Sequence, residues 1–253
     1  MTKLPKIMNE IDVKDIYEKD VLAIWGKFEN HEIFSNPDFE YRKHPLLPKI
    51  VHKECLMFIG MNPSFTKGSV IPENEKNIGF YQIQKEENFK DIPYFEKMKE
   101  IAEYCKSEWT HLDLFFIRET KQELIEKLSY TDKGIDFLNA QLKITFEIIE
   151  RANPKLIIVS NALASEFFGK KKETKHRKLD KIWKGFDLYF DNNIWKNDVT
   201  FNSKIGTYEI KLNDKLVPIL FSGMLSGQRA LDIGSLERLK WQSKMILESR
   251  TKK

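Results

Sequence analysis

Four short apolar segments occur along the chain, each bounded by polar or glycine-containing sequence. They are ECLMFIG (54–60), THLDLFF (110–116), PKLIIVSN (154–161) and LVPILFSG (216–223). A run of this length that is apolar at most positions is typical of a strand buried on both faces of a parallel sheet. The pattern therefore predicts four central strands.

Helical periodicity fills most of the intervals between these segments. Apolar residues recur at helical spacing in 12–30, 91–108, 121–128, 134–152, 162–169 and 235–250. Pro93 suits the first turn of its segment, and Asn153-Pro154 ends the longest one. The alternation predicts an α/β fold with three layers, α/β/α, around a central, mainly parallel, four-stranded sheet.

The chain of 253 residues is long enough for one large core, and we predict a single domain over residues 1–253. It would contain a helical N-terminal region (1–50) and an insertion before the last strand (169–214). Within the insertion, FDLYFDNN (186–193) and IGTYEIKLND (205–214) indicate additional β-structure.

Composition excludes several classes of protein. No apolar run approaches the length of a membrane span, and the N-terminal MTKLPKIMNEID lacks the apolar stretch of a signal peptide. Cys55 and Cys105 have no metal-binding spacing and indicate no disulfide framework; we expect two buried thiols, and a single bridge between them is the alternative. We therefore expect a soluble cytoplasmic protein without metal or cofactor, and the sequence indicates no obligate protein partner.

Basic residues are concentrated in one part of the insertion. KKKETKHRKLDKIWK (170–184) holds eight Lys or Arg residues and two acidic ones, whereas the whole chain has a net charge of +4. Such a run is typical of a solvated surface, and it equally suits a patch that binds phosphates. In the second interpretation Lys171, Lys172 and Arg177 contact the phosphates of a nucleic acid.

Polar residues follow the predicted strands at their carboxyl ends, where ligands bind in folds of this class. Common nucleotide-binding, zinc-protease and serine-hydrolase motifs are absent from the sequence. In GMNPS (60–64), Gly60 permits close approach of a ligand and Pro63 stiffens the loop. Asn62 offers a donor and an acceptor to a water molecule or a sugar. An Asn-Pro pair is also a common turn initiator without any chemistry.

IGMNPS (59–64) resembles the first motif of the uracil-DNA glycosylase superfamily. The similarity is greatest to its single-strand-selective monofunctional and mismatch-specific branches, which have G-M-N-P-G and G-I-N-P-G. Ser64 replaces the final glycine. SGMLSGQRALDIGSLERL (222–239) resembles N-P-S-G-L-S-R followed by S-L-E-K-L in the mismatch-specific branch.

The resemblance implies that Asn62 positions the water that attacks C1′ of a nucleotide flipped out of DNA. Phe80, or failing that Tyr81, would stack on the extruded base, although either aromatic suits a core position equally well. The loop 222–229 would enter the duplex, with Met224 or Leu225 filling the gap, or it is a plain strand-to-helix turn. The implied base-binding residues are Gly60, Met61, Phe80, Tyr81 and Asp113, and the DNA-binding ones are Ser64, Ser222, Met224, Leu225, Ser226, Gln228 and Arg229.

Two departures from the superfamily concern the base. Leu220-Phe221-Ser222 stands where most members have H-P-S, whose histidine assists the leaving base. Asp113 stands where members that excise uracil have an asparagine. An ionised carboxylate only accepts hydrogen bonds, so it repels uracil O4 and suits the exocyclic amine of cytosine. Sharing a proton with cytosine N3 would raise the pKa of Asp113 or protonate the base.

Other roles remain open for these two strand residues. Asp113 would alternatively pair with Arg118 or cap a loop. His111, on the same face of its strand, would assist the leaving base or be a structural histidine.

The sequence thus predicts a monofunctional DNA glycosylase that acts on duplex or single-stranded DNA. Asn62, Asp113 and His111 are its candidate catalytic residues, and a modified or damaged cytosine is its expected base, with anti-phage defence as one setting. The alternatives are a uracil-DNA glycosylase of base-excision repair, a non-catalytic nucleic-acid-binding relative, and a small-molecule enzyme on the same scaffold.

Overall fold

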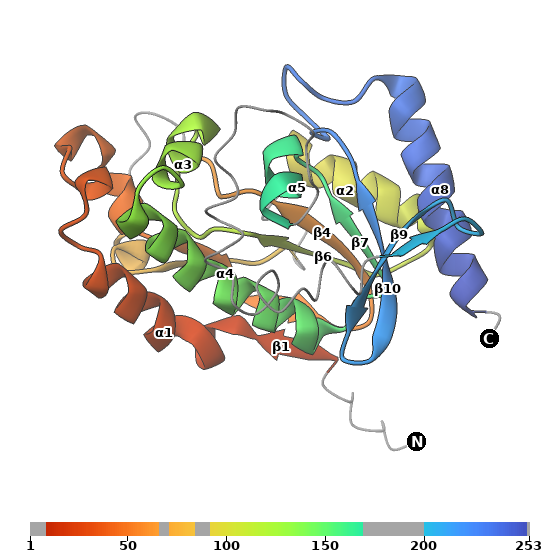
Figure 1. Cartoon of the computed structure of the whole chain (residues 1–253), viewed down its shortest axis with the longest axis horizontal. Helices are drawn as coiled ribbons and strands as arrows, with labels where there is room; N and C mark the ends of the chain where they lie inside the picture. The colour runs from red at the N-terminus through yellow and green to blue at the C-terminus, as the bar shows by residue number, and fades with distance from the viewer. Residues whose placement is uncertain (1–8, 66–70, 84–91, 169–199, 252–253) are drawn as a thin grey trace.

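A central sheet of six strands organises the protein, as seen in a computed structural model that describes residues 9–65, 71–83, 92–168 and 200–251 (Figure 1). The strands lie in the order β6 (Trp109–Asp113), β4 (Leu56–Gly60), β7 (Leu156–Val159), β10 (Lys215–Phe221), β9 (Thr207–Leu212) and β8 (Thr200–Asn202). The first four are mutually parallel, and β9 and β8 are antiparallel to their neighbours.

The four parallel strands are those that the apolar pattern predicts, but the prediction of a four-stranded sheet is wrong. The chain from Thr200 to Leu212 forms a hairpin that pairs with the edge of β10 and adds two strands. Its β9 strand confirms the β-structure expected in 205–214. The second predicted segment, 186–193, lies outside the described residues.

The order of the parallel strands reverses at β4, because the chain passes first to β6 on one side and then to β7 on the other. Ligand sites in open α/β sheets form at such a reversal, outside the carboxyl ends of the strands. Two further small sheets, each of two strands, occur in the described chain. One pairs β1 (Glu10–Asp12) with β3 (Ile50–His52), and the other pairs β2 (Leu46–Pro48) with β5 (Gly79–Tyr81).

The predicted helices are all present among the described residues. They are α1 (Val13–Lys27), α2 (Pro93–Cys105), α3 (Gln122–Leu128), α4 (Asp132–Ala152), α5 (Ala162–Phe168) and α8 (Ile233–Thr251), with short 3-10 helices η1 (Glu32–Phe34), η2 (Pro37–Lys43) and η3 (Glu73–Glu75). Local chemistry sets their ends: Thr131 caps α4 through Gly134 N–H, and Asn153 ends α4 with a left-handed φ of 47°.

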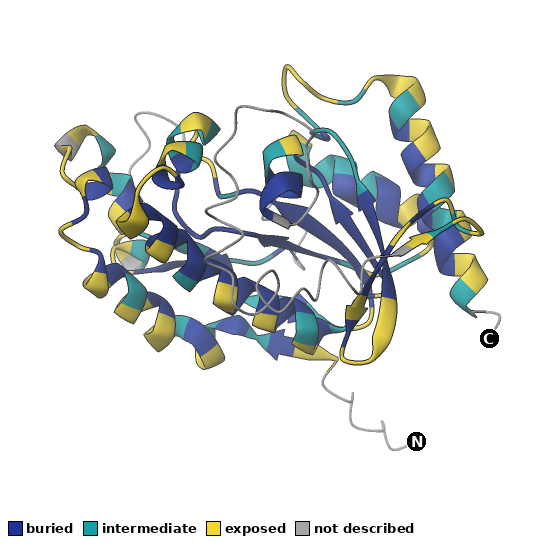
Figure 2. Ribbon diagram, in the orientation of Figure 1, coloured by how far each residue is buried: buried dark blue, intermediate teal, exposed yellow. Residues whose placement is uncertain are grey.

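Alternating side chains of the central strands enter two separate apolar clusters. Met57 and Ile59 of β4 pack in the cluster that contains residues of α1 and α4, whereas Leu56 and Phe58 pack with residues of α2 and α8. Figure 2 shows the buried strands between helices whose outer faces are exposed. The fold is therefore a mixed α/β fold with helices on both faces of a mostly parallel sheet.

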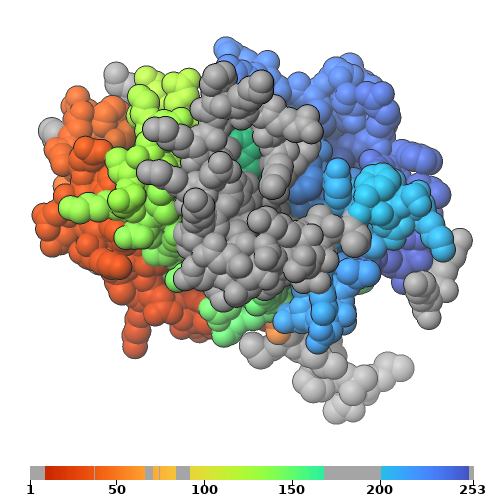
Figure 3. All heavy atoms as spheres, in the orientation of Figure 1, coloured from red at the N-terminus to blue at the C-terminus, as the bar shows by residue number. Residues whose placement is uncertain are grey.

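The N-terminal and C-terminal parts of the described chain lie on opposite sides of the molecule (Figure 3). The central strands join these two sides, so residues far apart in sequence meet at the carboxyl ends of β4, β6, β7 and β10. In the described part of the chain, no helix combines the length and the apolarity that crossing a membrane requires.

Candidate active site

A cavity of about 640 Å³ lies at the carboxyl ends of the parallel strands, where the strand order reverses. Its volume falls within the range of pockets that hold small ligands. The predicted site residues that line it are Met61, Asn62, Ser64, Phe80, Tyr81, His111, Asp113, Met224 and Ser226. Tertiary folding thus gathers residues from the loop after β4, from β5, from β6 and from the loop after β10.

Asn62 is held by its amide nitrogen. Nδ2 donates to the carbonyl oxygens of Pro63 (3.1 Å), Ile117 (3.3 Å) and Glu119 (2.6 Å). With three oxygens around it, this position can be filled only by the NH₂ group, because Oδ1 there would be repelled. The orientation leaves Oδ1 as a buried acceptor with no hydrogen-bond partner among the described residues. A bound water or ligand hydroxyl would satisfy that oxygen.

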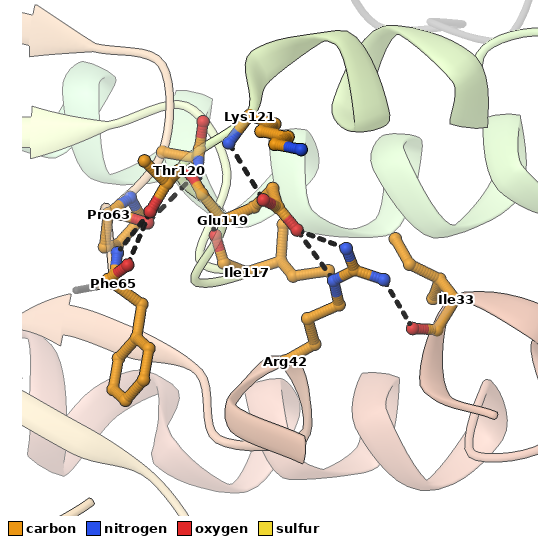
Figure 4. Close-up of polar contacts among 9 residues, drawn as sticks. Ile33, Arg42, Pro63, Phe65, Ile117, Glu119, Thr120 and Lys121 are labelled. Atoms are coloured by element: carbon orange, nitrogen blue, oxygen red, sulfur yellow. Dashed lines mark hydrogen bonds and ion pairs between the residues drawn. The ribbon is translucent and has the colours of Figure 1, made fainter. Parts of the chain in front are cut away.

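The loop that carries Asn62 is docked on the segment that follows β6 (Figure 4). Glu119 N–H donates to the carbonyl of Pro63 at 2.9 Å. Thr120 Oγ1 accepts from Phe65 N–H at 3.2 Å and donates to Phe65 C=O at 2.5 Å. Neither segment is a helix or a strand, so these bonds replace the secondary structure that would otherwise fix the backbone.

Gly60 allows two neighbouring strands to bring Asp113 over the backbone of β4. The two residues are register partners in the parallel β4–β6 pair. A Cβ atom on Gly60 would lie 2.0 Å from Asp113 Oδ1 and 2.8 Å from the Tyr94 hydroxyl. The sequence predicts close approach at Gly60 by a ligand, but this space is taken by the Asp113 carboxyl group.

His111 lies at the centre of a buried aromatic and polar cluster. The hydroxyl of Tyr81 is 2.8 Å from Nδ1, and that of Tyr94 is 3.3 Å from Nε2 and 3.4 Å from Ser160 Oγ. Asp113 Oδ1 lies 3.6 Å from Nε2. Because tyrosine hydroxyls already contact both ring nitrogens, His111 would act on a ligand mainly by orienting these hydroxyls.

Burial makes this cluster uncharged near neutral pH. Desolvation lowers the pKa of His111, which is 1% exposed, to about 3. The same cause raises the pKa of Asp113, which is 7% exposed, to about 8. Burial also holds the pKa of Tyr81 well above its usual value. Asp113 is therefore mainly a neutral carboxyl group at pH 7, able both to donate and to accept a hydrogen bond.

Arg118 is not a partner of Asp113, so that alternative from the sequence is wrong. Its Nη2 donates to Glu75 at 2.6 Å and its Nε donates to the carbonyl of His44 at 2.8 Å. These bonds direct Arg118 toward the segment that leads into β5, away from the carboxyl group at the end of β6. Among the described residues that line the cavity, Asp113 is the acidic one.

The two candidate stacking residues have different surroundings. Phe80 is partly buried against the larger apolar cluster, and Lys14 Nζ lies 5.8 Å from its ring centroid. The Tyr81 hydroxyl is hydrogen-bonded to His111.

Tyr94 and Phe95 also line the cavity, although the sequence predicted only an amphipathic helix around them. A pair of aromatics directly after Pro93, at the start of a helix, is the sequence signal that could have identified them.

The loop after β10 is divided between core and cavity. Met224 and Ser226 line the cavity, whereas Leu225 is 3% exposed and packs with residues of α2 and α8. The prediction that Leu225 fills the gap left by a flipped base is therefore wrong, because its side chain is buried in the smaller apolar cluster. Gln228 and Arg229 are exposed next to Gly227, whose φ of 88° makes the turn.

The remaining predicted contacts lie at the margin of the site or beyond the described residues. Ser64 is exposed at the cavity rim, and the Ser222 hydroxyl donates to Gly223 C=O. Lys171, Lys172 and Arg177 lie outside the described residues. In the described ranges, no group of three or more His, Cys, Asp or Glu side chains could hold a metal ion.

No protein-family model matches the chain, and no curated protein shows significant sequence similarity to it. The function is therefore inferred from the geometry of this cavity.

Replacing Gly60 with alanine is expected to displace the Asp113 carboxyl group and to lower the free energy of unfolding by about 1–3 kcal/mol, as overpacking does. Urea denaturation measures this change. Gly26→Ala is the control, because Gly26 has no heavy atom within 4 Å of its added Cβ and lies in the exposed part of α1. Equal stability of the two variants would show that Asp113 does not occupy this position.

The raised pKa of Asp113 predicts that stability falls as pH rises from about 4 to about 8, because the folded state keeps a proton that the unfolded state releases. The lowered pKa of His111 predicts a loss of opposite sign as pH falls below about 6.5, which offsets the Asp113 contribution between about pH 4 and 6.5. Urea denaturation should therefore show a net fall in stability from about pH 6.5 to 8 that Asp113→Asn removes, and the loss below pH 6.5 should become steeper in that variant. The exposed control Asp136→Asn should keep both; an unchanged slope in Asp113→Asn would contradict the assignment.

Proposed function

We propose that this protein is a monofunctional DNA glycosylase, which extrudes a nucleotide into the cavity and hydrolyses its N-glycosidic bond. The observation that carries the proposal is that one cavity is lined both by Asn62, whose Oδ1 is buried without a partner among the described residues, and by Asp113, whose raised pKa keeps its carboxyl group neutral at pH 7. A three-layer α/β/α fold of the uracil-DNA glycosylase type belongs to the same proposal. Support for it comes from the four parallel strands, the helices on both sheet faces and the motifs at the strand ends.

Asn62 would accept a hydrogen bond from the attacking water and so orient its lone pair toward C1′ of the sugar. A neutral amide is too weak a base to deprotonate water early, so bond breaking must run ahead of attack. The water oxygen forms a bond to C1′ while the C1′–N bond breaks and its electron pair leaves with the base. The departing base gains a proton from a carboxyl group of the protein, and the attacking water releases one to solvent, from which that carboxylate is later reprotonated; a neutral base and an abasic sugar result.

Asp113 would read the base and supply the proton. In its neutral form its hydroxyl donates to N3 of cytosine while its carbonyl oxygen accepts from the exocyclic amine. Transfer of the carboxyl proton to N3 during bond cleavage makes the base a better leaving group and leaves a carboxylate beside it. Because unmodified cytosine is part of normal DNA, we propose a modified or damaged cytosine as the base, with anti-phage defence as one setting.

Excision of uracil in DNA repair is the second candidate function. A neutral Asp113 is compatible with uracil, whereas the ionised Asp113 assumed from the sequence would repel uracil O4. A neutral carboxyl group can also donate to uracil O4 and accept from N3–H, as an asparagine amide would. The repulsion expected from an ionised Asp113 therefore applies only above its raised pKa of about 8.

Oligonucleotides that carry uracil, mismatched thymine, cytosine or modified cytosines test the proposal, with alkaline cleavage revealing abasic sites. Asn62→Ala should lower the rate of base release by about 100-fold, because the water is no longer oriented, and leave DNA affinity within about twofold. Asn213→Ala, an exposed asparagine in the turn after β9, is the control. Absence of base release from every oligonucleotide by the wild-type protein would contradict the glycosylase proposal.

Asp113→Asn tests which base is read. The amide has a fixed donor and a fixed acceptor, which fit uracil O4 and N3–H. It also lacks the acidic proton. We expect release of the cytosine derivative to fall by at least about tenfold and release of uracil to rise relative to it, as one bidentate contact to a base allows. An unchanged ratio of the two rates would show that Asp113 does not select the base.

A further inference from the structure

A buried ion pair lies behind the cavity and joins the N-terminal region to the segment after β6. Arg42, which is 5% exposed, contacts the carboxylate of Glu119, which is 3% exposed, through Nη2 at 2.5 Å and Nε at 2.7 Å. Arg42 Nη1 also donates to Ile33 C=O at 3.1 Å, and Glu119 Oε1 accepts from Lys121 N–H at 2.8 Å (Figure 4). Both carboxylate oxygens of Glu119 are thus engaged, whereas Arg42 Nη2 is in ion-pair contact with Oε2 but makes no hydrogen bond among the described residues.

A buried ion pair of this kind is a poor source of stability by itself. Removing two charges from water is unfavourable, and the attraction between them roughly offsets that loss. Its geometric consequence is more specific, because the pair fixes a residue within an irregular segment. Residues 117–121 form neither helix nor strand, so the Glu119 backbone has no regular hydrogen-bond ladder to hold it.

The backbone of Glu119 is in direct contact with Asn62. Its carbonyl oxygen accepts from Asn62 Nδ2 at 2.6 Å, the shortest of the three bonds to that amide. Its N–H donates to the carbonyl of Pro63 at 2.9 Å. A shift of the Glu119 backbone would therefore release or rotate the Asn62 amide.

The helix η2 contacts the Asn62 loop at a second point. Tyr41, next to Arg42, stacks on Phe65 with ring centroids 4.4 Å apart and an interplanar angle of 15°. Arg42 itself is held from behind, since its carbonyl oxygen accepts from Trp25 Nε1 at 2.9 Å. The η2 helix is thus anchored to α1 and holds both the Asn62 loop and the segment on which that loop is docked.

We propose that Arg42 and Glu119 are positioning residues for Asn62. Their ion pair fixes the Glu119 carbonyl oxygen, which fixes the Asn62 amide and thereby leaves Oδ1 available to the water. The structural part of this proposal stands on the contacts of Arg42, Glu119 and Asn62 alone. Its catalytic consequence rests on the proposed glycosylase function.

Glu119→Gln tests the proposal because it keeps the shape of the side chain and removes its charge. We expect kcat for base release to fall by about tenfold, with KM and DNA affinity within about twofold, since a small misplacement of a positioning group affects chemistry more than binding. Glu119→Asp, which keeps the charge on a shorter side chain, should restore part of the lost kcat. The thermal midpoint of each variant is measured in parallel.

Nuclear magnetic resonance of the Asn62 side-chain amide, assigned by the signal that Asn62→Ala removes, gives a readout independent of activity. In Glu119→Gln the two amide protons should shift and exchange faster with solvent than in the wild type. Glu209→Gln is the matched control, because Glu209 is similarly buried and pairs with Arg250 at 3.1 Å at the far edge of the sheet. It should leave the Asn62 signals and kcat unchanged.

Unchanged Asn62 signals in Glu119→Gln, with a loss of thermal stability equal to that of Glu209→Gln, would show that the ion pair is only structural and would overturn the proposal. If the wild-type protein releases no base, the glycosylase function fails, and the Asn62 signals still decide whether Glu119 positions the amide. If the wild type is active and Glu119→Gln keeps full kcat, the catalytic consequence is wrong.

Discussion

The site depends on the docking of the Asn62 loop against the segment after β6. Because β4 and β6 are parallel neighbours, their carboxyl ends bring two irregular segments side by side at one edge. The amide nitrogen of Asn62 donates to three carbonyl oxygens, one of which, that of Pro63, also accepts from Glu119 N–H. The Asn62 side chain thus joins the two segments through Nδ2 and keeps Oδ1 as an acceptor without a partner among the described residues. A residue that orients a water molecule requires such a free acceptor.

The second constraint is the removal of charge from the cavity floor. Gly60 admits Asp113 over the backbone of β4, and burial of Asp113 and His111 moves both pKa values in the direction of the neutral forms. A neutral carboxyl group has a donor and an acceptor, so the cavity can present both to the edge of a base. The residue type and its environment thus have to be considered together, since an ionised Asp113 would present acceptors only.

Much of the fold could be predicted from the sequence, because a buried parallel strand and an amphipathic helix each have a local apolar period. The four parallel strands, the helices α1 to α5 and the helix α8 follow from that period. The pairing of the β8–β9 hairpin with β10, which makes the sheet six-stranded, was not predicted, because pairing with an edge strand depends on which edge of the sheet is free. Leu225 was assigned to the wrong surface for a related reason, because an apolar residue in a loop has no period that reveals its direction.

By itself, the sequence determined the order of strands and helices and the placement of Gly60, Asn62 and Asp113 at strand ends, because these features depend on residues a few positions apart. Tertiary structure alone decided that the Asn62 amide meets carbonyl groups from residues 117 and 119. It also decided that Tyr94 joins His111 and that Arg42 reaches Glu119 across 77 positions of sequence. Such contacts arise only when the strands align their ends and the helices α2 and η2 pack against them, so no local pattern in the chain specifies them.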